Sequence, residues 1–457
     1  MDLVSLFALG LLVVSAALGL ALGRRRLDYR GFFAAEHRAS ALLAGLSGTA
    51  IGLSAFTFVG GPALVVQQGV GALWMILPAP LTGVLQCWVV GGWLVRRTPR
   101  ALSVPELLGQ SFGHPGRLVA AVLVAFGCVA GLAVQAKASG VLGAALLGGP
   151  ELFWAVAVGL ATAAYMAAGG MRAGVWVDAV QGTVMGLVAL GLAAFALVHS
   201  ANTGALGTLL ADPGKLLGSF GAVPPGKAFA WYLLFTLGTL AQPHYLQKFF
   251  LLRDERELER LPLVLTGSLM TVLTVWVGVG LAALALVSAG SLPAQGDQVV
   301  PALLSRLGPG VVGLAGVGCF FAIMSTVSSL LNLAAAALTY DLPQALGRPP
   351  AGVHWARLAT GVVGALGVGL GVGSERGVAW LGVLGWGFLT ASFLPAVLAA
   401  RFGVGSPRPA AAAMVLGALI CLGLEQLRPA LPPGLEPGLA GAACGFLLLS
   451  LSPRGKP

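Results

Sequence analysis

A cluster of hydroxyl side chains interrupts an apolar stretch, residues 319–341, that is long enough to cross a bilayer as a helix. The cluster consists of Ser325, Thr326, Ser328 and Ser329, followed by Asn332. Spacings of three and four residues place the serines and Asn332 on one helical face. Uncharged hydroxyl oxygens are hard ligands that suit a small cation and can release it again. Serine and threonine can also bond back to their own helix, so helix packing is the alternative interpretation.

The composition is that of a polytopic membrane protein. Of 457 residues, 57% are hydrophobic, 9% are charged and 68 are glycine. The net charge of +10 is spread between apolar segments, which argues against nucleic acid as a partner. The five cysteines lack metal-ligand spacing, and the sequence contains no HExxH motif and no nucleophile beside a base at membrane depth. We therefore expect no enzymatic activity, no transition metal and no cofactor.

Thirteen apolar segments are expected to cross the membrane. The first, 2–23, has no cleavage site before the arginines at 24–26, so we interpret it as a retained helix. The other twelve are 41–69, 72–95, 118–147, 151–169, 175–198, 226–248, 261–287, 307–338, 352–372, 377–400, 409–427 and 436–452. This count places most of the 26 Lys and Arg residues in loops on one side. The positive-inside rule then predicts an outside amino terminus and a cytoplasmic carboxyl terminus.

Two of these segments carry interruptions. Segment 41–69 is rich in glycine and includes Pro62, and segment 226–248 is interrupted between Gly238 and Pro243. Interrupted helices expose backbone carbonyls and amides, which are tolerated at membrane depth where they line a binding site. Because the interruptions are five crossings apart, we predict two inverted five-helix repeats with a site at the midplane.

Four motifs occur in the order and at the topological positions expected of a known family. They are SVPELLGQSFG (103–113), GGMRAGVWVDAVQG (169–182), AQPHYLQKFF (241–250) and AIMSTVSSLL (322–331). Together they make the chain resemble the sodium:solute symporters over most of its length. That family includes bacterial permeases for proline, pantothenate and sialic acid, and the sodium/glucose transporters.

The resemblance implies an all-α protein of about 13 transmembrane helices in the bacterial cytoplasmic (inner) membrane, with a LeuT-like inverted five-plus-five repeat. The expected division is an accessory helix and cytoplasmic loop at 1–40, repeats at 41–224 and 225–400, and two accessory helices with a short tail at 401–457. The implied function is sodium-coupled uptake of a small polar or anionic organic solute by alternating access.

The resemblance also implies two sodium sites. The main site is expected to use the carbonyls of Ala50, Leu53 and Ala322 with the hydroxyls of Ser325 and Thr326, in agreement with the hydroxyl cluster described above. The second candidate site consists of Asp178 with Ser325, Ser328 and Ser329. A competing interpretation places Asp178 in the first turn of its helix, where its carboxylate would cap amides.

Candidate solute contacts follow from the same resemblance: Ser54, Thr57, Gln135, Lys137, Phe235 and Thr239. The two hydroxyls could instead cap the broken helix, and Lys137 could instead reach the outer interface. A Lys137 that faces the cavity would pair with a solute carboxylate. Gly52 stands where proline permeases carry an acidic residue, which weakens proline as the solute, and Lys248 replaces the usual arginine. His244 is expected to make a structural hydrogen bond.

Two alternatives stay open. The fold could couple to protons, with Asp178 as the carrier. The chain could also be a solute sensor, although the short tail after Leu451 leaves no room for an output domain and requires a separate signalling partner. Otherwise the expected partners are sodium, the solute and the lipid bilayer, with no obligate protein partner.

Overall fold

The structure, a computed structural model, describes residues 38–97, 99–212, 220–293 and 295–452, with isolated positions 10, 13, 14, 17, 21 and 33 before them. The predicted first helix, 2–23, therefore lies outside the described residues except at those positions. Within the described part, every regular element is helical, and one isolated parallel bridge joins Ala39 to Leu252. The all-α prediction is confirmed.

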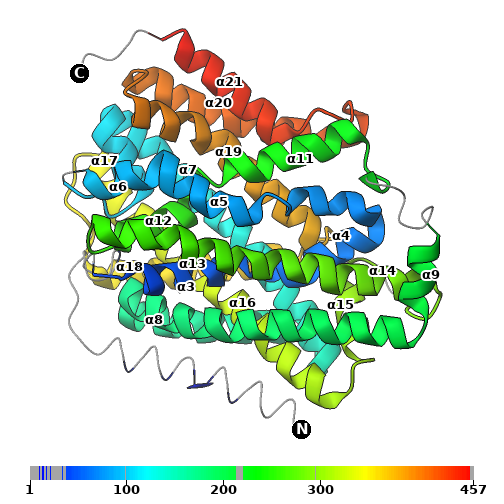
Figure 1. The fold of residues 1–457 in the computed structure, drawn as a ribbon. Helices are drawn as coiled ribbons and strands as arrows, with labels where there is room; N and C mark the ends of the chain where they lie inside the picture. The colour runs from blue at the N-terminus through cyan, green and yellow to red at the C-terminus, as the bar shows by residue number, and fades with distance from the viewer. Residues whose placement is uncertain are drawn as a thin grey trace.

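The helices follow one another with short connections (Figure 1). Their bounds are α3 Ala41–Gly52, α4 Gly61–Gln68, α5 Ala79–Gln86, α6 Gly92–Arg96, α7 Val104–Leu147, α8 Glu151–Asn202, α9 Ala205–Ala211, α11 Pro225–Gly238, α12 Pro243–Leu251, α13 Glu255–Thr274, α14 Gly280–Ser288, α15 Val299–Leu304, α16 Pro309–Ala336, α17 Leu342–Ala345, α18 Val353–Val372, α19 Val378–Phe402, α20 Pro407–Gln426 and α21 Pro437–Ser450. Short π-helical turns at Phe56–Gly60, Cys87–Gly91, Val275–Val279 and Ala337–Asp341 join successive helices.

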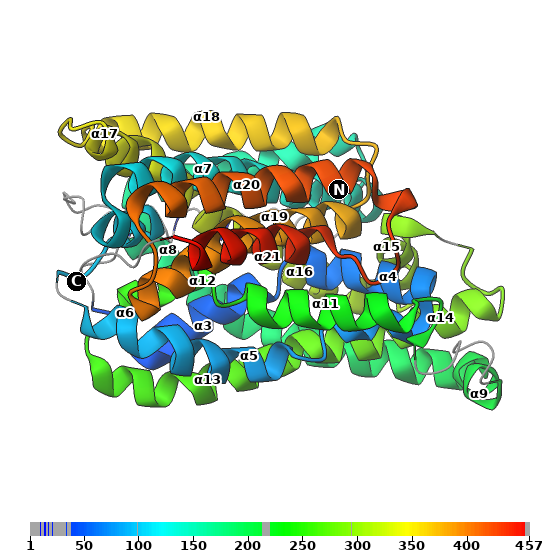
Figure 2. The same ribbon diagram turned by 90° about the horizontal axis from the view of Figure 1, so that it is seen from above.

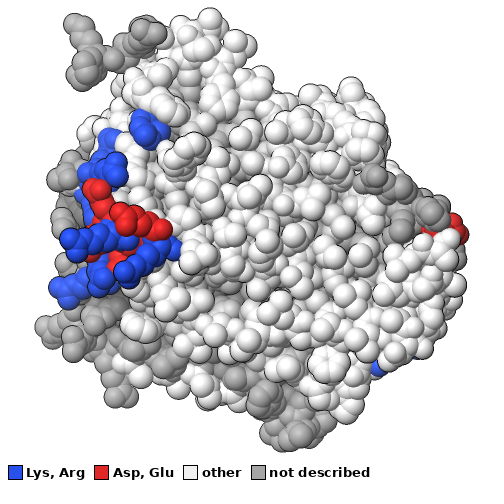
Figure 3. All heavy atoms as spheres, in the orientation of Figure 1, with Lys and Arg blue, Asp and Glu red and all other residues white. Residues whose placement is uncertain are grey.

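The surface matches a protein that sits in a bilayer. Among the described residues, nine helical spans are long and apolar enough to cross a membrane. Figure 3 shows Lys, Arg, Asp and Glu side chains gathered at the end of the bundle that holds α6, while the middle of this face carries none. A protein surface in the hydrocarbon core of a membrane must be apolar, and charged side chains are tolerated at its edge.

Helix α16 forms the centre of the bundle. It packs against α3, α7, α8 and α18, and Figure 2 shows it between α18 on one side and α13 on the other. Every residue from Ala315 to Ala336 is buried. The hydroxyl cluster therefore faces protein on all sides, which removes the cost of exposing polar groups to lipid.

The two predicted helix interruptions are present. Helix α3 ends at Gly52, where Leu53 turns out of the helix with φ −83° and ψ 69°, and helical structure resumes at Phe56. Helix α11 ends at Gly238 and α12 begins at Pro243, a residue suited to a helix start because it lacks an amide hydrogen. Both breaks leave backbone groups without partners in their own helix.

Candidate functional site

Four of the five predicted ligands of the main cation site are in mutual contact. The Ser325 hydroxyl donates to the carbonyl oxygens of Ala50 at 2.9 Å and Ala322 at 3.1 Å. The Thr326 hydroxyl donates to the same Ala322 carbonyl at 3.0 Å. The bond to Ala50 links α16 to the last turn of α3, where the helix ends and its carbonyls lose their usual amide partners, whereas the two bonds to Ala322 lie within α16.

Leu53, the fifth predicted ligand, is fully buried at the point where α3 ends. Its carbonyl belongs to the backbone that leaves the helix, three residues after Ala50. The whole set would offer five neutral oxygens and no carboxylate. Such a set suits a monovalent cation that must be bound and later released.

Asp178 forms a second polar cluster next to the first. Its carboxylate accepts hydrogen bonds from the hydroxyls of Ser328 at 2.8 Å and Ser47 at 3.1 Å. The interpretation of Asp178 as a helix cap is wrong, because its carboxylate bonds to side chains of α16 and α3. The helical break before it lies at Gly170, which has φ 54° and lies eight residues upstream.

Lys248 completes this second cluster. Its ammonium nitrogen lies 3.6 Å from Asp178 Oδ2, 2.8 Å from Ser47 Oγ and 3.4 Å from Ser329 Oγ. The lysine side chain is buried, and it reaches the cluster from α12. In the sequence, Lys248 stands out only as a replacement for arginine. The signal that could have revealed it was a lysine in an interrupted apolar helix, which needs a buried counter-charge.

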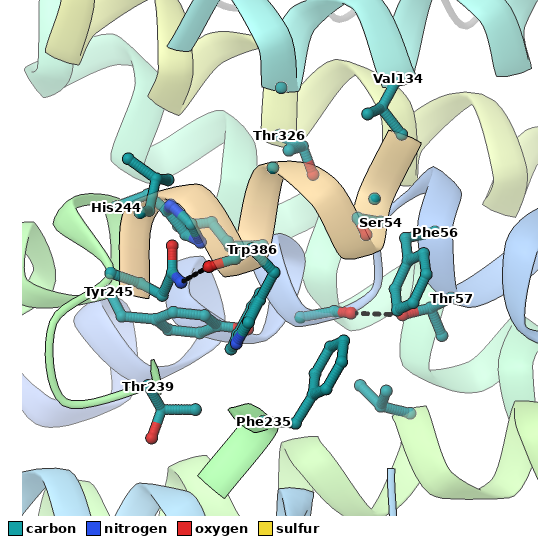
Figure 4. A pocket seen from close by; sticks show the side chains of 18 of the residues that line it. Ser54, Phe56, Thr57, Val134, Phe235, Thr239, His244, Tyr245, Thr326 and Trp386 are labelled. Atoms are coloured by element: carbon teal, nitrogen blue, oxygen red, sulfur yellow. Dashed lines mark hydrogen bonds between the residues drawn. The ribbon is translucent and has the colours of Figure 1, made fainter. Parts of the chain in front are cut away.

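A central cavity of about 130 Å³ lies beside the first cluster and between the broken helices (Figure 4). Five of the predicted solute contacts line it: Ser54, Thr57, Gln135, Phe235 and Thr239. Thr57 also donates to the Gly52 carbonyl at 2.7 Å, and Gln135 accepts from the Ala55 amide at 3.3 Å. These two side chains therefore satisfy backbone groups at the break in addition to facing the cavity. Thr326 of the first cluster lines the same cavity.

Aromatic rings form one wall of the cavity. Phe56 stacks on Phe235 with ring centroids 5.9 Å apart, and Phe235 stacks on Trp386 at 5.0 Å. Tyr245 meets Trp386 edge-on. Phe56, Trp386 and Tyr245 could not be identified as cavity residues from the sequence, because aromatic residues are common throughout membrane helices.

Two residues that line this cavity carry polar atoms without partners. Within the described part of the chain, nothing bonds to Gln242 Oε1 or to His244 Nδ1, although both atoms are buried. The structural hydrogen bond expected at His244 is therefore not made by its Nδ1 atom. Burying such atoms is costly unless a bound molecule or water satisfies them. The described lining residues include no Asp, Glu, Lys or Arg.

Lys137 does not line the central cavity, so its prediction as a solute contact there is wrong. Its ammonium lies 3.9 Å from Glu151 at the start of α8. Both residues line a separate cavity of about 530 Å³, together with Asp297. The long lysine side chain extends from α7 to this counter-charge.

Comparisons with known proteins agree with this architecture. The model of the sodium:solute symporter family matches residues 32–412. The chain is 25% identical over 449 residues to the sodium/proline symporter of Haemophilus influenzae, covering 91% of this chain and 87% of that protein. It is also 25% identical over 429 residues to the sodium/pantothenate symporter of Escherichia coli, covering 87% and 84%.

Solved structures show the same fold. A substrate-bound, outward-open Na⁺-coupled sialic acid symporter superimposes with a TM-score of 0.81 at 17% identity, covering 98% of this chain and 97% of that chain. Mhp1, a nucleobase-cation-symport-1 family transporter in a closed conformation, gives a TM-score of 0.59 at 14% identity, covering 91% and 92%.

Proposed function

The chain belongs to the sodium:solute symporter family, and from this membership we propose that it carries a small uncharged or zwitterionic solute into the cell together with sodium. Sodium-coupled uptake is the activity that the family and its curated relatives share. The observation that supports it most is the bonded junction of Ser325 and Thr326 with the carbonyls of Ala50 and Ala322.

We place the sodium ion at this junction, held by the five neutral oxygens of Ala50, Leu53, Ala322, Ser325 and Thr326. The ligands come from α3 and α16, which belong to the two proposed repeats, 41–224 and 225–400. An ion that bridges them stabilises only the arrangement in which both helices approach, so it shifts the conformational equilibrium by its differential affinity. Because Thr326 also lines the solute cavity, bound sodium fixes one wall of that cavity.

The cavity narrows the class of solute. Its described lining offers aromatic faces, hydroxyls and amides and no ionised side chain. A solute with a net charge would lose its hydration there without gaining a counter-charge. The ends of the broken helices supply only partial charges, which suffice for neutral polar groups or for the separated charges of a zwitterion. Gln242 Oε1 and His244 Nδ1 are available to bond it.

We propose that the protein resides in the bacterial inner membrane with its amino terminus outside and its carboxyl terminus in the cytoplasm, and that it needs no obligate protein partner. The exposed arginines near the end of α6, such as Arg96, then face the cytoplasm, as the positive-inside rule requires. The cavity that holds Lys137 and Asp297 then opens toward the outside.

Ligand-induced thermal stabilisation of the purified protein tests this solute class. Amino acids, organic acids, sugars, nucleobases and vitamins are compared in sodium chloride and in choline chloride, because ligands that bind the folded form raise its apparent stability. We expect uncharged or zwitterionic compounds to stabilise the protein in sodium only. Stabilisation by singly charged anions, or by any compound equally in both salts, would contradict the proposal.

A further inference from the structure

We propose that the Lys248 ammonium is a built-in cation that occupies the second cation site of this transporter. The inference rests on the proposed sodium-coupled function and specifies its ion count. The site consists of the Asp178 carboxylate with the hydroxyls of Ser47, Ser328 and Ser329. Asp178, Ser328 and Ser329 are also candidate ligands of the second sodium ion that the family resemblance implies.

The contacts of Lys248 are those that a small cation would make. The ammonium lies within 3.6 Å of one carboxylate oxygen and two hydroxyl oxygens. Ser328 holds the other carboxylate oxygen at 2.8 Å, and Ser47 both accepts from the ammonium and donates to the carboxylate. The Lys248 ammonium thus already contacts the carboxylate and hydroxyl oxygens that would otherwise be free to bind a sodium ion.

The balance of charge excludes a further ion. Asp178 and Lys248 are both buried, with side chains 1% and 4% exposed. Together they are neutral, and pairing offsets the large cost of taking two charges out of water. A sodium ion added to this cluster would leave a net positive charge in a buried site, where Coulomb repulsion is weakly screened. The cluster therefore takes either the ammonium or a sodium ion.

The pair also spans the two proposed repeats. Asp178 lies on α8 and Ser47 on α3, both in the first repeat, whereas Lys248 lies on α12 and Ser329 on α16 in the second. The Lys248 ammonium is covalently attached to the chain, so it can hold the two repeats together in every transport cycle. A sodium ion at the same place would have to be bound from solution in each cycle. Transport of a neutral solute would then move one positive charge per cycle, carried by the sodium ion at the main site.

Counting bound sodium on the purified, full-length protein tests the proposal. Radioactive sodium is titrated onto wild type, Lys248→Met and the double variant Lys248→Met with Asp178→Asn. Lys227→Met is the matched control, because Lys227 lies over the Trp231 ring, away from the Asp178 cluster. We expect Lys248→Met to bind one more sodium ion per protein than wild type, the double variant to lose that ion, and Lys227→Met to match wild type.

Two results would overturn the proposal. One is a wild-type protein that binds two sodium ions, a measurement that does not depend on any variant folding. The other is a folded Lys248→Met protein that gains no sodium, which is what a purely structural ion pair predicts. An error in the proposed main sodium site can be told apart from an error in this proposal. If the main site does not bind sodium, the wild-type protein binds none, whereas the extra sodium ion in Lys248→Met still tests the role of Lys248.

Discussion

The Ser325 hydroxyl donates a hydrogen bond of 2.9 Å to the backbone carbonyl of Ala50, a residue 275 positions earlier in the chain. The bond joins the middle of the buried helix α16 to the end of the broken helix α3. A side chain that bonds only within its own helix would stabilise that helix alone. Because this hydroxyl also reaches across, the proposed sodium ion would respond to the distance between the two helices.

Replacing Thr326 with Val should weaken sodium binding while preserving side-chain shape. Hydrogen bonds and ligand contacts to charged groups contribute about 1.5–3 kcal/mol, so we expect a loss of affinity of about tenfold or more. The measurement is the sodium concentration that half-maximally stabilises the purified protein. Thr339→Val is the control, because Thr339 makes the same bond within its helix, to Ala335 at 2.7 Å, away from the site. Equal sodium affinity in both variants would contradict the assignment of Thr326.

Replacing Gly382 with Ala should weaken solute binding by displacing one ring of the aromatic wall of the cavity. A Cβ atom at Gly382 would clash with the Phe56 ring, so the ring must move off Phe235. Stacked aromatic pairs contribute about 0.5–1.5 kcal/mol, and we expect the solute KM to rise by about twofold to tenfold. Gly385→Ala is the matched control, because Gly385 lines the same cavity and a Cβ there meets nothing within 4 Å. A KM unchanged in both variants would show that the Phe56 wall does not contact the solute.

Arg428 should be important for stability because it pairs with two buried carboxylates, Glu425 and Glu436, whose side chains are each 3% exposed. Arg428→Met removes the ion-pair partner of both, which we expect to cost about 3–5 kcal/mol. Arg96→Met is the control, because its exposed pair with Glu255 contributes at most about 1 kcal/mol. The measurement is the midpoint of thermal unfolding in detergent, and equal losses in both variants would contradict the prediction.

The pH dependence of Arg428→Met follows from Glu436. Burial raises the pKa of Glu436 and Arg428 opposes that rise, so removing Arg428 should raise the pKa further. A carboxyl with a raised pKa in the folded state favours folding when it is protonated, so stability falls as the pH rises through that pKa. We expect Arg428→Met to lose less thermal stability relative to wild type at about pH 5 than at about pH 8. A deficit that is constant over this range would contradict the account.

Local features of the sequence could predict much of the fold. Glycine loosens a helix because it has no Cβ, and proline interrupts one because it lacks an amide hydrogen. The breaks after Gly52 and between Gly238 and Pro243 could therefore be predicted from residue types alone. Helical periodicity likewise placed Ser325, Ser328 and Ser329 on one face. Every apolar segment predicted from residue 41 onward lies on helical structure.

Partners on different helices could not be predicted from the sequence. Periodicity shows which residues share a face but not which helix that face meets. The contact between Lys248 and Asp178 depends on how α8 and α12 are rotated, and the stacking of Trp386 on Phe235 depends on the approach of α19 to α11. Lys137 was assigned to the wrong cavity for the same reason.

Gradient-driven uptake into proteoliposomes tests the central claim most directly. The solute is one that stabilises the purified protein in sodium, and it is supplied with an inward gradient of either sodium or protons. Three proteins are compared: wild type, the double variant Ser325→Ala with Thr326→Ala, and the control Ser392→Ala, which changes a buried serine on α19. We predict accumulation by wild type and the control with the sodium gradient only, and its loss in the double variant. Accumulation driven by protons, or wild-type sodium dependence in the double variant, would contradict the account.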